Sequence, residues 1–188
     1  ITDPTSVFVI VNRDSNDITF MDIETRNIVG KVFLGNNVNP HMAMMSPVGR
    51  YVVTGGTRAN KAFVIDVRTL TLVKTIPVDL APEHLAFSPD GRWLSWMAPY
   101  ERRLNVFLRE LESGEERRLT SATERDVAGY FWAGEQNIVY VQDAAGDENW
   151  RLFSVRPDGG EAVDLTPYEG VQCRIVDELE ERDGEILF

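Results

Sequence analysis

Apolar residues in this sequence occur in short runs, and glycine, asparagine, aspartate or proline bounds nearly every run. The clearest runs cover residues 7–11, 51–54, 62–65, 72–76, 93–97 and 138–141. Alternation with a period of two and a high content of β-branched side chains are typical of β-strands. No segment shows a convincing helical period, and we interpret the acidic run 177–182 as a charged turn between strands. The pattern predicts an all-β chain.

These runs form a repeat. The string Met-Ser-Pro-Val-Gly-Arg-Tyr at 45–51 returns 42 residues later as Phe-Ser-Pro-Asp-Gly-Arg-Trp at 87–93, and residues 18–26 match residues 62–70 at a spacing of 44. Residues 105–108 and 152–155 take the same place in two looser copies. Repeats of this length with four short strands are typical of propeller blades. We therefore predict a β-propeller with four blades per chain, each a four-stranded antiparallel sheet.

The two ends of the chain indicate how a ring could close. Residues 7–11 read as the second strand of a blade that lacks its first strand, and residues 171–176 would supply that strand from the other end. Such closure removes an open sheet edge that would otherwise favour aggregation. Residues 184–188 also have the pattern of the second strand of a blade, so they would compete with residues 7–11 for the same place in a closed ring.

Composition changes at the middle of the chain. Residues 1–92 contain nine acidic and nine basic side chains, whereas residues 93–188 contain twenty-one and ten, so the net charge of −11 comes from the second half. All three lysines precede residue 92 and all four tryptophans follow it. The change coincides with the shared turn at 88–92, where two propeller sequences could be joined without disturbing either blade. We interpret residues 1–92 and 93–188 as two pairs of blades with different origins.

Each half resembles a different propeller family. The first contains Phe-Val-Ile-Asp at 63–66 and Val-Asp-Leu-Ala-Pro-Glu-His-Leu-Ala-Phe-Ser-Pro-Asp-Gly at 78–91, and it resembles the YVTN-type repeat, which is related to the propeller of haem nitrite reductases. The second contains Asn-Val-Phe-Leu-Arg-Glu-Leu-Glu-Ser-Gly-Glu at 105–115 and Leu119-Thr120. It resembles propeller domains of prolyl-oligopeptidase-like dipeptidyl and acylaminoacyl peptidases, and the TolB-type repeat. The two resemblances imply an engineered chimera of half-propellers; the alternative is a fragment of a longer natural propeller.

The catalytic parts of these families are missing from the sequence. A peptidase of this kind would carry a Gly-x-Ser-x-Gly elbow on a separate α/β-hydrolase domain, and no such string occurs. A haem protein would need axial ligands, for which His41 and His84 are the only histidines. They fall near the start of innermost strands but are offset by one residue in the repeat, so strand alternation would aim them to different sides. We interpret them as structural histidines.

Other candidate groups also favour structural roles. Cys173 is the only cysteine, which excludes an intrachain disulfide, and we expect it to be a packing residue on an inner strand. The carboxylates at 177–183 lack the spacing of a calcium loop. We therefore expect no catalytic residue, no cofactor and no metal, and we name His41, His84 and Cys173 as the residues that could line the central channel.

Charge and hydropathy limit the partners. A sequence pI near 4.6 disfavours nucleic acid, which requires clustered basic side chains. The sequence has no apolar run of the roughly 18–20 residues that a membrane-spanning helix needs. Residues 1–6 lack the basic start and apolar stretch of a signal peptide, so the sequence assigns no compartment. We expect neither nucleic acid nor a membrane as a partner.

The remaining expectations concern assembly and function. Blades that resemble those of seven- or eight-bladed rings would overpack the centre of a four-bladed ring. We therefore expect two copies to form a twofold homodimer, so that each chain is half of an eight-bladed ring. The predicted function is that of a propeller scaffold without native catalytic activity. The alternative is a propeller module that binds a small molecule, a peptide or a protein.

Overall fold

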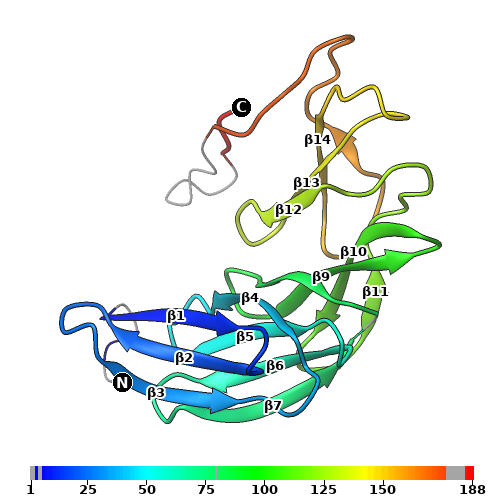
Figure 1. Cartoon of the computed structure of the whole chain (residues 1–188). Coiled ribbons are helices and arrows are strands. Elements are labelled where there is room, and N and C mark those ends of the chain that lie inside the picture. The colour runs from blue at the N-terminus through cyan, green and yellow to red at the C-terminus, as the bar shows by residue number, and fades with distance from the viewer. Residues whose placement is uncertain (1–2, 4–5, 79, 177–184) are drawn as a thin grey trace. The chain divides into compact units, whose positions relative to one another are not determined.

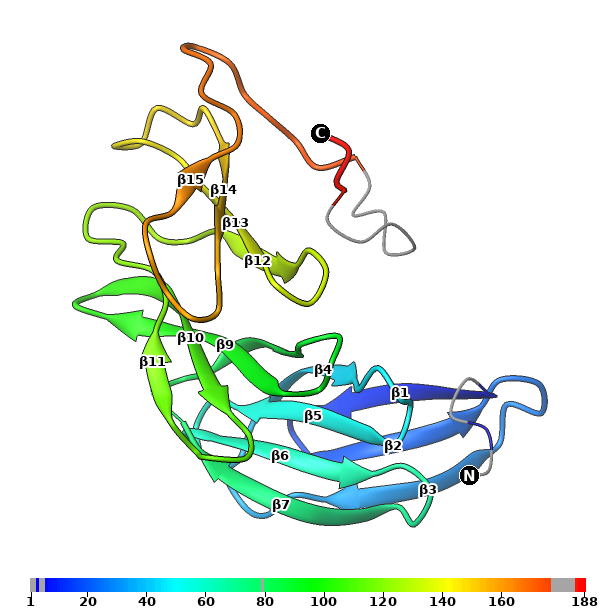
Figure 2. The same cartoon turned by 180° about the vertical axis from the view of Figure 1, so that it is seen from behind.

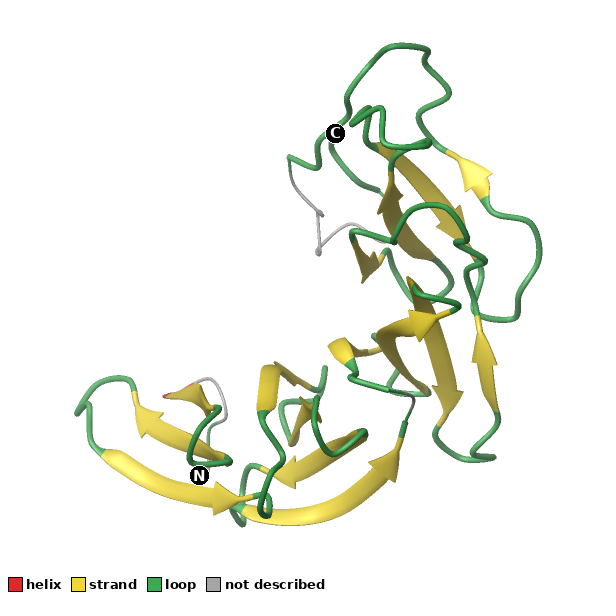
Figure 3. Cartoon of the chain, turned by 45° about the vertical axis from the view of Figure 1, so that its right-hand side comes forward, coloured by secondary structure: helices red, strands yellow, loops and turns green. Residues whose placement is uncertain are grey.

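The computed structural model describes residues 3, 6–78, 80–176 and 185–188. Within those residues the chain consists of strands and loops and contains no α-helix (Figure 3), so the all-β prediction is confirmed. Two compact units, Ile1–Phe87 and Ser88–Phe188, make up the chain. The charged turn predicted at 177–182 lies outside the described residues.

The first unit contains two antiparallel meanders, one of three strands and one of four (Figure 1). Its first sheet has the order β1-β2-β3 and its second the order β4-β5-β6-β7. The strands are β1 (Val7–Asn12), β2 (Asp17–Asp22), β3 (Ile28–Phe33), β4 (Pro40–Met45), β5 (Tyr51–Gly56), β6 (Lys61–Asp66) and β7 (Thr71–Pro77). A further strand, β8 (Glu83–Phe87), contacts β4 and β5. The described first sheet has three strands, and the missing one is the innermost, as the repeat predicted.

The second unit carries the remaining strands (Figure 2). The third sheet has the order β11-β10-β9-β8 and the fourth the order β12-β13-β14-β15. The strands are β9 (Trp93–Tyr100), β10 (Arg103–Glu110), β11 (Glu116–Arg118), β12 (Gly129–Trp132), β13 (Ile138–Gln142), β14 (Arg151–Val155) and β15 (Val163–Asp164). Four successive antiparallel sheets in one chain are the arrangement predicted for four propeller blades.

The core of the first unit lies between its two sheets. Ile18 and Phe20 from β2 pack with Val52, Phe63 and Ile65 from the second sheet, and each is at most 4% exposed. Five of the six residues of β6 are buried, and successive side chains of a strand point to opposite faces, so both faces of this strand are covered. A fully buried side chain of this size contributes about 1.5–3 kcal/mol. This explains why residues 62–65 read as a continuous apolar run.

The core of the second unit lies between the third and fourth sheets. It combines residues of both sheets: Trp93, Met97, Val106, Leu108, Ile138, Tyr140 and Val155. Aromatic stacking adds to this packing within each sheet. Trp96 stacks on Phe107 with ring centroids 5.9 Å apart, and Tyr140 stacks on Phe153 at 5.3 Å. Such pairs are worth about 0.5–1.5 kcal/mol beyond their buried area.

The turn shared by the two halves has the same hydrogen bonds in both copies. The hydroxyl groups of Ser46 and Ser88 each accept a bond from the backbone N–H five residues later, at 3.0 and 2.8 Å. Gly49 and Gly91 adopt φ angles of 67° and 72°, which residues with a Cβ rarely adopt. The Pro-x-Gly turn predicted from the sequence is confirmed.

The strand predicted at residues 171–176 is not present in the structure. This segment is irregular, and its backbone hydrogen bonds include one from Cys173 N–H to the Trp150 carbonyl and one from Val176 N–H to the Leu187 carbonyl. A strand requires a regular ladder to one neighbouring edge, and these two bonds run to different segments. Of the strand predicted at 184–188, residues 185–188 are described, and they contain an isolated bridge at Leu187.

Candidate functional site

The two histidines lie on innermost strands, as predicted, but at different positions of the repeat. His41 is on β4 and His84 is on β8. When the two shared turns are aligned, His84 corresponds to Met42 in the repeat. Both residues have a left-handed backbone conformation, with φ of 49° at His84 and 56° at Met42. His41 instead corresponds to Glu83. The repeat therefore does not present the two imidazoles as a matched pair.

The surroundings of these groups show no assembled metal site. The buried Nδ1 atom of His41 makes no hydrogen bond within the described part of the chain. Across the described residues, no three His, Cys, Asp or Glu side chains are grouped so that they could hold a metal ion. Cys173 is a half-buried free thiol in a loop and not on an inner strand, because the segment around it forms no ladder. The assignment of these residues to a channel stays a prediction.

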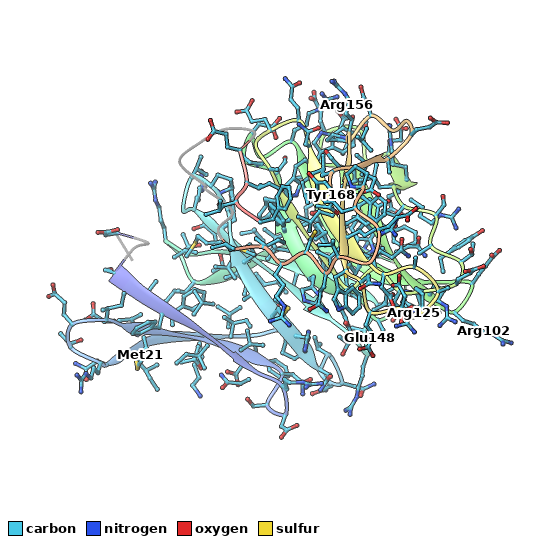
Figure 4. All side chains as sticks on the ribbon, turned by 90° about the horizontal axis from the view of Figure 1, so that it is seen from above. Met21, Arg102, Arg125, Glu148, Arg156 and Tyr168 are labelled. Carbon is cyan, nitrogen blue, oxygen red and sulfur yellow. The ribbon has the colours of Figure 1, made fainter. Side chains whose placement is uncertain are left out.

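A surface groove of about 260 Å³ lies in the second unit, where three turns meet. The turns precede β9, connect β12 to β13 and follow β14. The lining residues are Asp90, Arg92, Trp93, Glu135, Gln136, Arg156, Pro157 and Asp158. Figure 4 places Arg156 well away from Arg125 and Glu148, which belong to another group of loops. The groove thus combines three carboxylates with two guanidinium groups on one surface.

Trp93 forms the apolar part of this groove. The guanidinium carbons of Arg92 and Arg117 lie 5.1 and 5.4 Å from its ring centroid, and Trp93 is only 6% exposed. Arg117 also donates to the Asp158 carbonyl at 3.2 Å. Cation–π contacts of this kind are worth about 0.5–2 kcal/mol. Because the guanidinium groups of Arg92 and Arg117 cover the indole ring, a ligand would contact the carboxylate and guanidinium groups at the rim of the groove.

The loops on the other side of the unit contain an ion pair. Arg125 donates from Nε to Asp143 at 2.9 Å, and the Asp143 side chain is 1% exposed. The hydrogen bond from Arg125 lowers the pKa of Asp143, and the same bond raises the pKa of Arg125. Glu148 donates its backbone N–H to Asp143 at 3.4 Å. A carboxylate held in its charged form fixes the loop and is a poor general acid.

The second unit also contains a buried polar cluster around Ser95. Its hydroxyl accepts hydrogen bonds from Tyr130 at 2.9 Å and from the Trp132 indole at 3.0 Å. Burial raises the pKa of Tyr130 well above its usual range. Ser95 has no exposed surface, so it cannot reach a substrate carbonyl as a nucleophile. We assign the cluster to packing between the third and fourth sheets.

In the first half of the chain, asparagines in left-handed turns connect one blade to the next. The Asn16 side-chain carbonyl accepts from the N–H groups of Val38 and Asn39, both at 2.8 Å. In the following blade, Asn60 accepts from the N–H of Ala81 at 3.0 Å. Asn16 and Asn60 have φ of 58° and 53°, a conformation that asparagine tolerates.

In the second half, a buried threonine that follows the last strand of each sheet accepts a hydrogen bond from a strand of the same sheet. Thr120 accepts from the Val106 N–H at 2.9 Å, and Thr166 accepts from the Leu152 N–H at 3.0 Å. Both threonines follow a leucine and are 46 residues apart. Sequence reasoning found the first Leu-Thr pair but missed the second, although the recurring dipeptide was a sufficient signal. The first half thus holds its connections through Asn16 and Asn60, and the second half uses Thr120, Thr166 and also Asn105, which accepts from the Ala122 N–H at 2.7 Å.

Comparison with known proteins supports a propeller and no narrower class. No model of a known protein family matches the chain. Dipeptidyl aminopeptidase BIII of Pseudoxanthomonas mexicana is 32% identical over 106 residues, which are 55% of this chain and 15% of that protein. The chain thus spans a small part of this relative's length.

Solved structures share the fold. Hydrazine synthase of Kuenenia stuttgartiensis superimposes with a TM-score of 0.70 and 18% identity, covering 85% of this chain and 46% of that chain. Dihydro-heme d1 dehydrogenase NirN in complex with DHE gives a TM-score of 0.65 and 20% identity, covering 87% and 36%. Together with the four antiparallel sheets, these β-propeller neighbours establish that the chain is a β-propeller protein. The described part contains no helix that is long and apolar enough to cross a membrane.

Proposed function

We propose that the chain is a propeller scaffold, built from half-propellers 1–92 and 93–188 of different ancestry, and without peptidase activity of its own. The observation that carries this proposal is the change of hydrogen-bonding side chain between the halves, from Asn16 and Asn60 to Thr120 and Thr166. It falls across the same shared turn as the change in charge. The two pairs occupy different places in the blade, which supports a different ancestry for the two halves.

Similarity to a dipeptidyl aminopeptidase supports a peptidase-propeller origin for part of the chain. Such an origin does not imply hydrolysis, because in enzymes of this kind the nucleophile elbow belongs to a different domain. The sequence contains no Gly-x-Ser-x-Gly string, and the hydroxyl of Ser95 is buried in hydrogen bonds to aromatic side chains. The scaffold proposal therefore assigns the second half to structure.

The test is an assay of the purified chain with dipeptidyl and acylaminoacyl p-nitroanilides. We expect no release of p-nitroaniline above that of a heat-denatured sample. A sample purified in the same way from cells that carry an empty expression vector serves as the control for contaminating activity. Turnover that follows the purified protein through two different columns would overturn the proposal.

The groove favours a second candidate function, a binding module for small zwitterions. Asp90 and Glu135 could receive an ammonium group while Arg156 receives a carboxylate, an arrangement that suits dipeptides. A ligand present at one hundred times its Kd would stabilise the fold by about 2.7 kcal/mol. A panel of dipeptides in a thermal unfolding assay tests this function. A shift that Glu135→Gln abolishes and Gln142→Ala leaves unchanged would support it, and the absence of any shift would reject it.

A further inference from the structure

The two guanidinium groups that line the groove of the second unit already have carboxylate partners. Arg92 donates from Nε to Glu110 at 2.7 Å, and Arg156 donates from Nε to Asp158 at 3.2 Å. An anionic ligand would therefore meet positive charges that neighbouring carboxylates already neutralise, since opposite charges a few ångströms apart cancel at longer range. The groove thus offers little free positive charge.

Two carboxylates of the groove have no such partner. Across the described residues, neither Asp90 nor Glu135 forms a salt bridge. Oδ1 of Asp90 accepts from the Ser88 hydroxyl at 2.5 Å and from the Arg92 N–H at 3.0 Å, which orients this carboxylate within its turn. Glu135 is exposed in the turn between β12 and β13. The charge that remains unneutralised in the groove is therefore negative, and it comes from two different turns.

The aromatic ring of the groove offers no open face to a ligand cation. Cations without hydrogen-bond donors, such as quaternary ammonium groups, bind on the faces of aromatic rings. Trp93 is only 6% exposed, and the guanidinium carbons of Arg92 and Arg117 lie 5.1 and 5.4 Å from its ring centroid. Arg117 is held in place by donating to Glu115 at 2.7 Å. A ligand cation would therefore bind to carboxylate oxygens, which favour a cation that donates hydrogen bonds.

We propose that the groove binds a primary ammonium group, which Asp90 and Glu135 recognise together. A primary ammonium has three N–H donors and a full positive charge. It matches these carboxylates, because within the described part of the chain the Oδ2 atom of Asp90 and both oxygens of Glu135 accept no hydrogen bond. The acidic excess of residues 93–188 also attracts cations. The inference rests on the second candidate function, and it narrows the ligand from a zwitterion to its ammonium end.

An ammonium group suits the groove better than a metal ion. Calcium takes six to eight oxygen ligands, whereas the described residues contain no group of three His, Cys, Asp or Glu side chains that could hold a metal ion. An ammonium group needs only as many acceptors as it has N–H donors. The volume of about 260 Å³ also leaves room for the carbon atoms that carry the ammonium.

The test compares blocked ligands in the thermal unfolding assay. A dipeptide amide has the ammonium group without the carboxylate, and Nα-acetyl-lysine amide places the ammonium on a side chain. An N-acetyl dipeptide has only the carboxylate, and an N-trimethyl dipeptide amide has the positive charge without N–H donors. We expect one or both of the primary amines to raise the unfolding temperature, and the one that does identifies the source as a peptide terminus or a lysine side chain. The other two compounds should give no shift, and added salt should reduce the effect of the amines.

Variants assign the effect to the groove. Glu135→Gln should weaken binding of the primary amine by about two- to fivefold, the range of an exposed ion pair. Arg156→Gln should strengthen it, because Asp158 then loses its ion-pair partner. Glu124→Gln is the matched control, since Glu124 is exposed beside Arg125, in the group of loops that lies away from Arg156 (Figure 4).

Two results would overturn the proposal, and they can be told apart. An equal shift with the N-acetyl dipeptide or the N-trimethyl compound would reject recognition of a primary ammonium and leave the binding module intact. No shift with any of these compounds or with the unblocked dipeptide would reject the binding module as well.

Discussion

Arg92 donates from Nε to the carboxylate of Glu110 at 2.7 Å, across the turn where the two halves of the sequence meet. One blade earlier, Arg50 makes the same contact with Asp66 at 3.1 Å. Each arginine also lies 5.1 Å from the aromatic ring of the following residue. The turn at 88–92 therefore keeps the local contacts of the preceding blade, while the acidic partner changes from Asp to Glu.

The buried threonines of the second half should each be worth a measurable part of its stability. Thr120→Val leaves the Val106 N–H without its acceptor inside a sheet, and Thr120 is 4% exposed. We expect a loss of about 1–3 kcal/mol in the free energy of unfolding, measured by urea denaturation. Thr120→Ser keeps the hydroxyl and should lose clearly less. A larger loss for Thr120→Ser than for Thr120→Val would mean that the methyl group, and not the hydrogen bond, matters.

The asparagines of the first half should contribute to the free energy of unfolding in proportion to the number of hydrogen bonds that they accept. Asn16 accepts two backbone N–H groups and Asn60 accepts one. Asn16→Ala should therefore destabilise the protein more than Asn60→Ala, with losses of about 1–3 kcal/mol that include the left-handed backbone. Asn16→Asp retains the acceptor and serves as the control. The reverse ranking in thermal or urea unfolding would contradict this assignment.

A close approach of two strands explains a glycine in β5. A Cβ on Gly55 would lie 2.8 Å from the Pro82 carbonyl oxygen and 2.5 Å from Leu85. Gly55→Ala should cost about 1–3 kcal/mol, because the backbone of the neighbouring strand must move. Gly129→Ala is the matched control, since its Cβ would meet nothing within 4 Å. Hydrogen exchange should also show faster exchange of β8 amides in Gly55→Ala alone.

Much of this fold follows from local pattern. The Ser-Pro-x-Gly turn fixes the first hairpin of two blades through a hydroxyl and a glycine close in sequence, so the printed residues reveal it. Continuous apolar runs such as residues 62–65 predict strands that are buried on both faces. These features depend on contacts within a few residues or on one repeated interface.

Other features depend on contacts that no local pattern encodes. Residues 171–176 have the alternation of a strand but form no ladder, because their backbone bonds run to the Trp150 and Leu187 carbonyls, which lie in different segments. The groove around Trp93 is assembled from three turns that are far apart in sequence. The unequal positions of His41 and His84 could be read from the repeat, whereas the left-handed backbone shared by Met42 and His84 could not.

Low pH should lower the stability of the second unit because it protonates the carboxylate of Asp143. The hydrogen bond from Arg125 lowers the folded-state pKa of Asp143, so its contribution is fully present above the unfolded pKa of about 4. The contribution is lost as the pH falls through the lower folded value. Asp143→Asn should reduce stability at pH 7 and flatten the acid limb of stability against pH. Arg125→Gln should reduce the pH dependence of the free energy of unfolding to a similar extent, and the double variant should be little less stable than either single variant. If the two single losses instead add in full, Arg125 and Asp143 do not stabilise the fold through each other.

All four tryptophans, at positions 93, 96, 132 and 150, belong to Ser88–Phe188, and Ile1–Phe87 contains none. Trp93 and Trp96 are buried, so their emission should shift to longer wavelength when that unit opens. The chain thus carries an optical reporter for one of its two compact units, while far-ultraviolet circular dichroism records the strands of both. Coincident curves from the two signals would define one cooperative transition, and separated curves would order the opening of the units in a single sample without any added label.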